Sequence, residues 1–390
     1  MLPPAQVDSL YEIVLSVEQL EPASSLLTNG VLQHINSALF LLHKLFSQDE
    51  LSFSQVQLGN AKSHQSRLLK CINKLLEACH LRNPEVTINC LRVLLAFLQK
   101  LDQVDQQLPM LEIKQTRMLE TGLKKCLFLS NAQIITGETV HLTLKVLTQI
   151  SFAYPLEIKE DIVKRVLDFC GHQDDQRAQE NAIKLICNLL TDEQSCSVVL
   201  QINAEEESAA INGIYQCLLS ESRNSLKYSL GAILNLTLLS EHRLRSCEMI
   251  LSSGGMSHLV GAIQKSFNLN DSESAQFGMK ALLNLLGYRN PMVKLLAAEL
   301  GYLDIFMMII RQMYQTVMKS AAQEVGRTDR AQTTKRRNES LRSAILAGMD
   351  LLDAVSGTSS PSQNKLKLLE STGFLPFCNR MVLLSVEKPT

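Results

Sequence analysis

Lys280-Ala-Leu-Leu-Asn284-Leu-Leu-Gly places one asparagine inside an apolar run, and the same arrangement occurs twice upstream. The other copies are Ile183-Lys-Leu-Ile-Cys-Asn188-Leu-Leu and Gly231-Ala-Ile-Leu-Asn235-Leu-Thr-Leu. The three asparagines are separated by 47 and 49 residues. Self-similarity at a period of tens of residues is typical of a repeat array, in which a single unit is too small to bury its apolar faces and stacking supplies the core.

A three-helix unit can be drawn around the last copy. Its helices are expected over residues 241–251, 256–267 and 272–286, with a turn at Gly254-Gly255. Asn83-Pro84 predicts a further helix start, since the asparagine can cap it and the first turn does not need the missing N–H. Apolar residues recur at helical spacing almost everywhere, so the sequence predicts an all-α protein.

Two shorter helices, a glycine turn and a third helix carrying Ala-Leu-Leu-Asn-Leu resemble the armadillo repeat. The resemblance is good over residues 192–286, fair up to Thr390, and weak before Glu138, where HEAT-like pairing of helices is the alternative. It implies a right-handed superhelical solenoid of stacked three-helix repeats. In this family the third helices line an inner face that usually binds an extended peptide or another protein.

Two regions are expected along the chain. Residues 1–137 are predicted to form irregular HEAT- or armadillo-like repeats, and residues 138–390 armadillo-like repeats. Within the second region, residues 323–340 are polar and basic and predict an exposed insertion loop. Residues 361–390 supply two helices without a third, so they predict an incomplete terminal unit. Its uncovered apolar side chains are expected to mediate self-association or partner binding: Phe374, Leu375, Phe377, Met381 and Leu383.

Composition narrows the classes of function. The net charge is −1, so no global field drives association with nucleic acids or membranes. No apolar run approaches the roughly 18 residues needed to span a bilayer, and the first residues lack the pattern of a secretory signal. The ten cysteines show no CxxC pair or zinc spacing, so small buried side chains in a reducing compartment are expected. The expected location is intracellular, in the cytoplasm or the nucleus.

Catalytic motifs are missing from the sequence. It contains no GxSxG elbow, P-loop, GxGxxG after a strand or HExxH, and its eight histidines are scattered. We therefore expect a protein that is not an enzyme and has no cofactor or bound metal.

The recurring amides are the main candidate site. Gln149, Asn188, Asn235 and Asn284 occupy equivalent positions of successive repeats. A buried amide is costly unless it is hydrogen-bonded, which leaves two interpretations. Each amide could bond the neighbouring helix and fix the stacking of repeats, or the column could clamp the backbone of an extended ligand.

The residues one helical turn before the amides suggest the charge of a partner. Importin-like armadillo adaptors carry a tryptophan there, whereas this chain has no tryptophan. Its residues at those places are Lys145, Lys184, Gly231 and Lys280, and Arg92 is a candidate to extend the series. A lysine stripe repels basic cargo and favours an acidic or phosphorylated segment, as in the catenin-like branch of the family. The alternatives are a chromosome- or nucleic-acid-associated repeat, a nuclear-transport adaptor, or solvated lysines that bind nothing.

Overall fold

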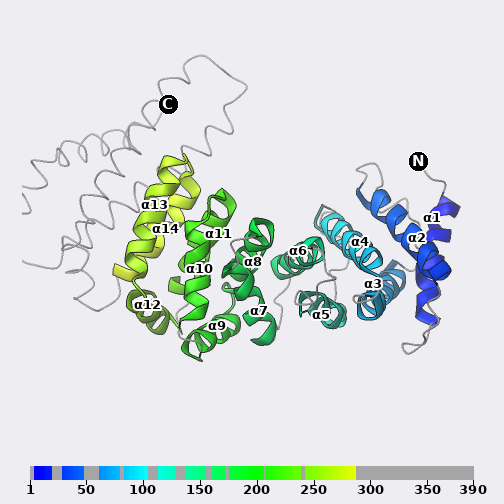
Figure 1. Ribbon diagram of the computed structural model, residues 1–390, viewed down its shortest axis with the longest axis horizontal. Helices are drawn as coiled ribbons and strands as arrows, with labels where there is room; N and C mark the ends of the chain where they lie inside the picture. Colours follow the sequence, from blue (N-terminus) through cyan, green and yellow to red (C-terminus); the bar gives the residue numbers. More distant parts are fainter. Residues whose placement is uncertain are drawn as a thin grey trace, which may run out of the picture. The chain divides into compact units, whose positions relative to one another are not determined.

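The computed structural model describes residues 4–19, 29–47, 61–79, 83–103, 113–128, 137–153, 160–171, 175–205, 208–238 and 242–286. These segments form fourteen α-helices and one 3-10 helix, and no strand occurs among them (Figure 1). The all-α prediction is therefore confirmed for the described part of the chain. The insertion loop at 323–340, the terminal unit at 361–390 and its apolar set lie outside the described residues.

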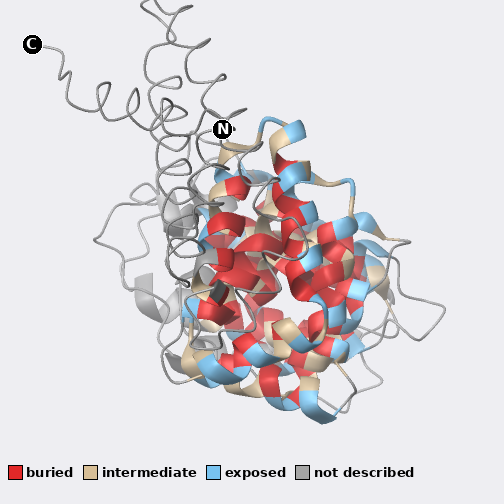
Figure 2. Ribbon diagram, turned by 90° about the vertical axis from the view of Figure 1, so that its left-hand side faces the viewer, coloured by how far each residue is buried: buried red, intermediate tan, exposed pale blue. Residues whose placement is uncertain are grey.

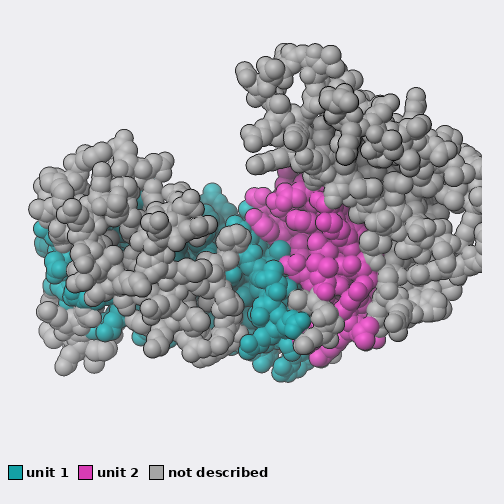
Figure 3. All heavy atoms as spheres, turned by 180° about the vertical axis from the view of Figure 1, so that it is seen from behind, with its two compact units in different colours: residues 1–217 teal, residues 218–390 magenta. Residues whose placement is uncertain are grey.

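The chain divides into two compact units, residues 1–217 and 218–390, which Figure 3 distinguishes by colour. The division falls within the last turn of α10 (Ala209–Leu219). The boundary predicted between residues 137 and 138 concerns a change in the type of repeat, whereas the division after residue 217 concerns compactness. The predicted boundary stays a prediction.

The helices of unit 1 alternate between two rows. The even row consists of α2 (Asn29–Ser47), α4 (Pro84–Gln103), α6 (Gly137–Ala153) and α8 (Gln176–Leu189). Successive helices of this row pack on one another, α2 on α4, α4 on α6 and α6 on α8. Since α3 also packs on α4, α5 on α6 and α7 on α8, the helices of this region associate as consecutive pairs.

The odd row of unit 1 is built in the same way. It consists of α1 (Pro4–Leu15), α3 (Ala61–Cys79), α5 (Ile113–Phe128), α7 (Glu160–Gly171) and α9 (Glu193–Glu205). A short 3-10 helix, Ser16–Gln19, follows α1 and packs on α3. Because α1, α3, α5 and α7 each pack on helices of both rows, the apolar core runs between the rows.

Unit 2 contains the three-helix repeat predicted from the sequence. After α11 (Arg223–Leu238) come α12 (Arg243–Ser252), α13 (Gly255–Asn268) and α14 (Ser272–Leu286), close to the expected bounds. The turn predicted before α13 is confirmed, and Gly254 has a φ of 74°, in the left-handed region that glycine adopts readily. Helix α14 packs on both α11 and α13.

Local sequence signals explain where several helices begin. Asn83 caps α4, because its Oδ1 accepts a hydrogen bond from the backbone N–H of Val86 at 3.3 Å. Asp175 caps α8 in the same manner, accepting from the N–H groups of Arg177 and Ala178. These bonds satisfy donors that have no partner inside the helix. The cap predicted at Asn83 is thus confirmed.

Buried side chains lie on the helix faces that meet other helices, and exposed ones lie on the outer faces (Figure 2). Seven of the eight described cysteines are buried, and none of the eight forms a disulfide. Burial raises the pKa of Cys126 to about 12, so this thiol stays protonated and behaves as a small apolar side chain. None of the described helices is long and apolar enough to cross a bilayer.

Candidate functional site

Helix α6 is buried on almost every side and exposes one narrow stripe. Between residues 138 and 150, the side chains that reach solvent are Glu138, His141, Lys145 and Gln149. Their spacing of three or four residues places them on one face of the helix. Two of the residues proposed from the sequence, Lys145 and Gln149, therefore lie on the single accessible face of α6.

Helix α8, which packs directly on α6, carries the next two candidates. Lys184 and Asn188 are half-buried and four residues apart, whereas Lys145 on α6 is exposed. The structure thus brings four of the seven predicted residues onto two neighbouring helices of unit 1. We call this region the α6–α8 surface: Glu138, His141, Lys145, Gln149, Arg177, Asn181, Lys184 and Asn188.

The amide of Asn188 bonds the preceding row helix. Its Nδ2 donates to Oγ of Ser151 at 3.1 Å and lies 3.4 Å from the carbonyl oxygen of Thr148. The Ser151 hydroxyl itself donates to the carbonyl oxygen of Thr148 at 2.8 Å. The hydroxyl therefore acts as a relay between the amide and the backbone of α6.

The same arrangement recurs in unit 2. Nδ2 of Asn284 donates to Oγ1 of Thr237 at 3.1 Å, and that hydroxyl donates to the carbonyl oxygen of Leu234 at 2.8 Å. Thr237 stands two residues after Asn235, as Ser151 stands two residues after Gln149. The amide of one repeat thus bonds a hydroxyl at the same place of the preceding repeat, so the column contributes to stacking.

The remaining candidates lie on the neighbouring helices α11 and α14 of unit 2. Asn235 is half-buried on α11, and Lys280 is exposed on α14, one turn before Asn284. Gly231, which replaces a lysine in the series, is buried and interrupts the positive charge. Whether any of these residues contacts a ligand stays a prediction.

Polar bridges between successive even-row helices were not predicted from the sequence. Nδ2 of Asn89 on α4 donates to Oδ1 of Asn36 on α2 at 2.7 Å. Arg92 on α4 forms an ion pair with Glu138 on α6. Arg92 was expected to extend the positive stripe, but this pairing compensates much of its charge. A comparable bridge joins Lys227 to Glu273 in unit 2 at 2.7 Å.

His141 and Asn181 form the bridge between α6 and α8. Nδ1 of His141 lies 3.0 Å from Nδ2 of Asn181. This amide nitrogen of Asn181 also donates to the carbonyl oxygen of Arg177 at 2.7 Å. Because a carbonyl oxygen can only accept, the amide atom that faces it must be the nitrogen. Nδ1 of His141 is therefore the acceptor, and the neutral ring carries its proton on Nε2.

The electrostatic environment of His141 is positive. Burial is the largest cause that lowers the pKa of His141 below its ordinary value, and the charge of Lys145 lowers it further. The backbone hydrogen bond with Arg177 raises the pKa, the charge of Arg177 lowers it, and the charge of Asp175 raises it. The charges of Lys145 and Arg177 thus add to burial in favouring the neutral form of the ring.

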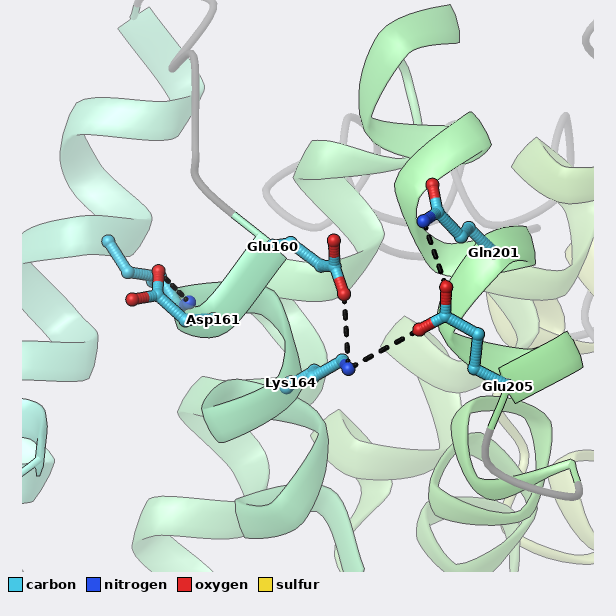
Figure 4. Close-up of polar contacts among 6 residues, drawn as sticks. Glu160, Asp161, Lys164, Gln201 and Glu205 are labelled. Atoms are coloured by element: carbon cyan, nitrogen blue, oxygen red, sulfur yellow. Dashed lines mark hydrogen bonds and ion pairs between the residues drawn. The ribbon is translucent and has the colours of Figure 1, made fainter.

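A separate charged network lies on the odd row (Figure 4). Nζ of Lys164 pairs with Glu160 at 3.0 Å and with Glu205 at 3.5 Å, and Gln201 donates to Glu205 at 2.9 Å. The hydrogen bond from Gln201 is the main cause that lowers the pKa of Glu205. Lys164 also borders a cavity of about 280 Å³ between α7, α9 and α10. Since its charge is compensated, this network is typical of a structural ion pair.

Within the described residues, no group of three or more histidine, cysteine, aspartate or glutamate side chains could hold a metal ion. The buried thiol of Cys170 has a pKa raised well above its ordinary value, chiefly by burial. Its backbone carbonyl oxygen accepts from Nε2 of Gln179 at 3.0 Å and from Sγ of Cys217 at 3.4 Å. These groups connect helices and are not arranged as a nucleophile with a base.

Solved structures of helical-repeat proteins are similar to this chain, although no protein-family model and no curated protein sequence matches it. The designed armadillo repeat protein YIII(Dq)4CqI aligns with a TM-score of 0.50 and 16% identity, over 71% of this chain and 99% of that one. Another designed armadillo repeat protein, solved in complex with the peptide (KR)4, aligns with a TM-score of 0.50 and 15% identity, over 70% and 98% of the two chains. The stacked helices, the glycine turn and these likenesses show that the chain has the fold of armadillo repeat proteins.

Proposed function

We propose that this chain is a non-enzymatic scaffold that binds an extended acidic or phosphorylated segment of another protein. The observation that carries the proposal is the α6–α8 surface, where the one accessible face of α6 adjoins that of α8. Lys145 and Lys184 lie on this face beside amides, and the environment of His141 is positive. In unit 2, Lys280 and Asn284 repeat the combination.

The likeness to a designed protein that holds (KR)4 supports a peptide-binding role for this fold. The charge of the expected partner differs, because lysines on the binding face repel a basic peptide and attract an acidic one. The described cysteines, which are mostly buried and form no disulfide with one another, agree with an intracellular protein, in the cytoplasm or the nucleus.

Charge reversal tests the proposal. Lys184→Glu combined with Lys280→Glu should weaken binding of a fluorescent peptide of alternating glutamate and serine by roughly ten-fold or more, as measured by fluorescence polarisation at low salt. The melting temperature should change little, since surface lysines contribute little to folding. Each single variant reports on one unit, because Lys184 belongs to unit 1 and Lys280 to unit 2.

The matched control is Lys70→Glu, which reverses an exposed lysine on α3 of the odd row. Equal losses in the control and the double variant would contradict the proposal, because binding would then follow net charge alone. A single-stranded oligonucleotide that binds more tightly than the peptide, with steep salt dependence, would assign the surface to nucleic acid instead.

A further inference from the structure

The α6–α8 surface has a centre that the lysine pattern alone did not indicate. His141 and Asn181 bridge the two helices, and exposed cations stand one turn away on either side, Lys145 on α6 and Arg177 on α8. The amide of Asn181 is held by the carbonyl oxygen of Arg177, so it fixes the imidazole from one side. This arrangement places a cation one helical turn from each member of the His141–Asn181 pair.

We propose that His141, Lys145 and Arg177 form a subsite for one anionic side chain of the bound segment, either a carboxylate or a phosphate group. The inference rests on the proposed function and deepens it. The Nε2–H of the neutral ring is a hydrogen-bond donor, and the two flanking cations supply charge-assisted donors. Asn181 positions the ring and does not need to touch the ligand.

Charged groups lie near this site on all three adjoining helices. They are Arg92 on α4, Glu138 and Lys145 on α6, and Asp175, Arg177, Glu180 and Lys184 at the start and on the body of α8. Arg92 and Glu138 form an ion pair and largely cancel. Asp175 is engaged at the helix start, where its Oδ1 accepts two backbone N–H bonds. The charges of Lys145 and Arg177 both lower the pKa of His141, whereas the backbone hydrogen bond with Arg177 raises it.

An anion bound at the subsite would neutralise part of the positive charge of Lys145 and Arg177. Anion binding and the protonation of His141 are therefore linked. Without an anion, the pKa of His141 lies below its ordinary value. With an anion beside the ring, the protonated form gains a favourable interaction and the pKa rises. Binding then takes up protons, and affinity increases as the pH falls through the interval between the two pKa values.

The experiment is a pH titration of the histidine Cε1 protons by NMR, with the signal of His141 assigned from its loss in His141→Gln. The full chain is titrated in sodium chloride, sodium acetate and sodium phosphate at equal ionic strength. We expect the midpoint of His141 to move to higher pH in acetate and in phosphate relative to chloride. A response to phosphate alone would identify the subsite as a phosphate site, and a response to acetate alone as a carboxylate site.

Two variants separate the subsite from a general charge effect. Lys145→Gln should raise the midpoint in chloride and reduce the response to anions, whereas Lys70→Gln on the odd row should change neither. The subsite does not exist if the titration midpoint of His141 is the same in acetate and phosphate as in chloride. It does not exist either if Lys145→Gln and Lys70→Gln change that midpoint by equal amounts.

Peptide binding keeps this result distinct from the proposed function. Lys145→Gln should weaken an acidic or phosphoserine peptide roughly two- to five-fold. If acidic peptides bind but anions do not change the titration midpoint of His141, the proposed scaffold function is supported and the proposed subsite is contradicted. If anions move the midpoint while no acidic peptide binds, the subsite stands and the scaffold proposal fails.

Discussion

Units 1 and 2 stack their helices with the same hydrogen bond but with different repeats. In unit 1 the helices up to α8 associate as pairs in two rows, whereas α12, α13 and α14 of unit 2 form a three-helix repeat. Asn188 nevertheless bonds Ser151 as Asn284 bonds Thr237. The amide-to-hydroxyl bond therefore does not depend on the number of helices per repeat, but on the contact between successive row helices.

Close packing at a glycine and polar pairs between helices occur in both units. In unit 2, a Cβ added at Gly278 of α14 would lie 2.5 Å from Cγ1 of the buried Ile263 on α13 and 3.2 Å from Leu230 on α11. In the even row of unit 1, polar pairs such as His141 with Asn181 join the helices. Close approach is not confined to unit 2, because a Cβ added at Gly122 of α5 would lie 2.6 Å from Oδ1 of Asn73 and 3.0 Å from Cβ of Leu76 on α3.

The largest expected effect follows from this close packing. Gly278→Ala should destabilise the protein by roughly 1–3 kcal/mol, because the added methyl group forces Ile263 or the helix backbone to move. Urea denaturation followed by circular dichroism measures the loss. The control is Gly261→Ala on the exposed face of α13, where a Cβ would meet nothing within 4 Å and alanine should be neutral or stabilising. Equal stabilities of the two variants would show that α13 and α14 pack less closely than described.

A smaller effect is expected from the amides that the two units share. Asn188→Ala and Asn284→Ala should each reduce stability by about 0.5–1.5 kcal/mol, the usual net contribution of one hydrogen bond. A double-mutant cycle of Asn284→Ala with Thr237→Val should yield a coupling energy, since both variants remove the same bond. If either alanine variant instead weakens acidic-peptide binding at unchanged stability, the column serves the ligand more than the stacking.

The smallest effect concerns acid sensitivity in unit 1. The pKa of His141 is lower in the folded protein than in the unfolded chain, so protons bind preferentially to the unfolded chain. The contribution of neutral His141 to the free energy of unfolding is fully present above the pKa of His141 in the unfolded chain. It is lost as the pH falls through the lower pKa of His141 in the folded protein. His141→Gln keeps an acceptor for Asn181 but does not titrate, so its stability should decline less than that of the unchanged protein between pH 7 and pH 5. Parallel declines, measured by urea denaturation at each pH, would show that His141 does not contribute.

Several features of the fold could be predicted from the sequence because their causes are local. The spacing of apolar residues determines a helix, Asn83 before a proline caps one, and Gly254 takes the φ of 74° that its turn requires. The period between Asn235 and Asn284 likewise indicates equivalent places in successive repeats. In each case the deciding residues lie within a few positions of one another or recur at a fixed interval.

The partners of these residues were decided only by tertiary structure. Arg92 was expected to add positive charge, yet stacking brings it to Glu138, which lies 46 residues further along the chain. The need for glycine at position 278 depends on Ile263 of another helix. His141 and Asn181 stand 40 residues apart, and neither carries a local signal of their contact. A helix face can be derived from its period, but the atoms that meet across two faces depend on the packing register, which only the folded chain supplies.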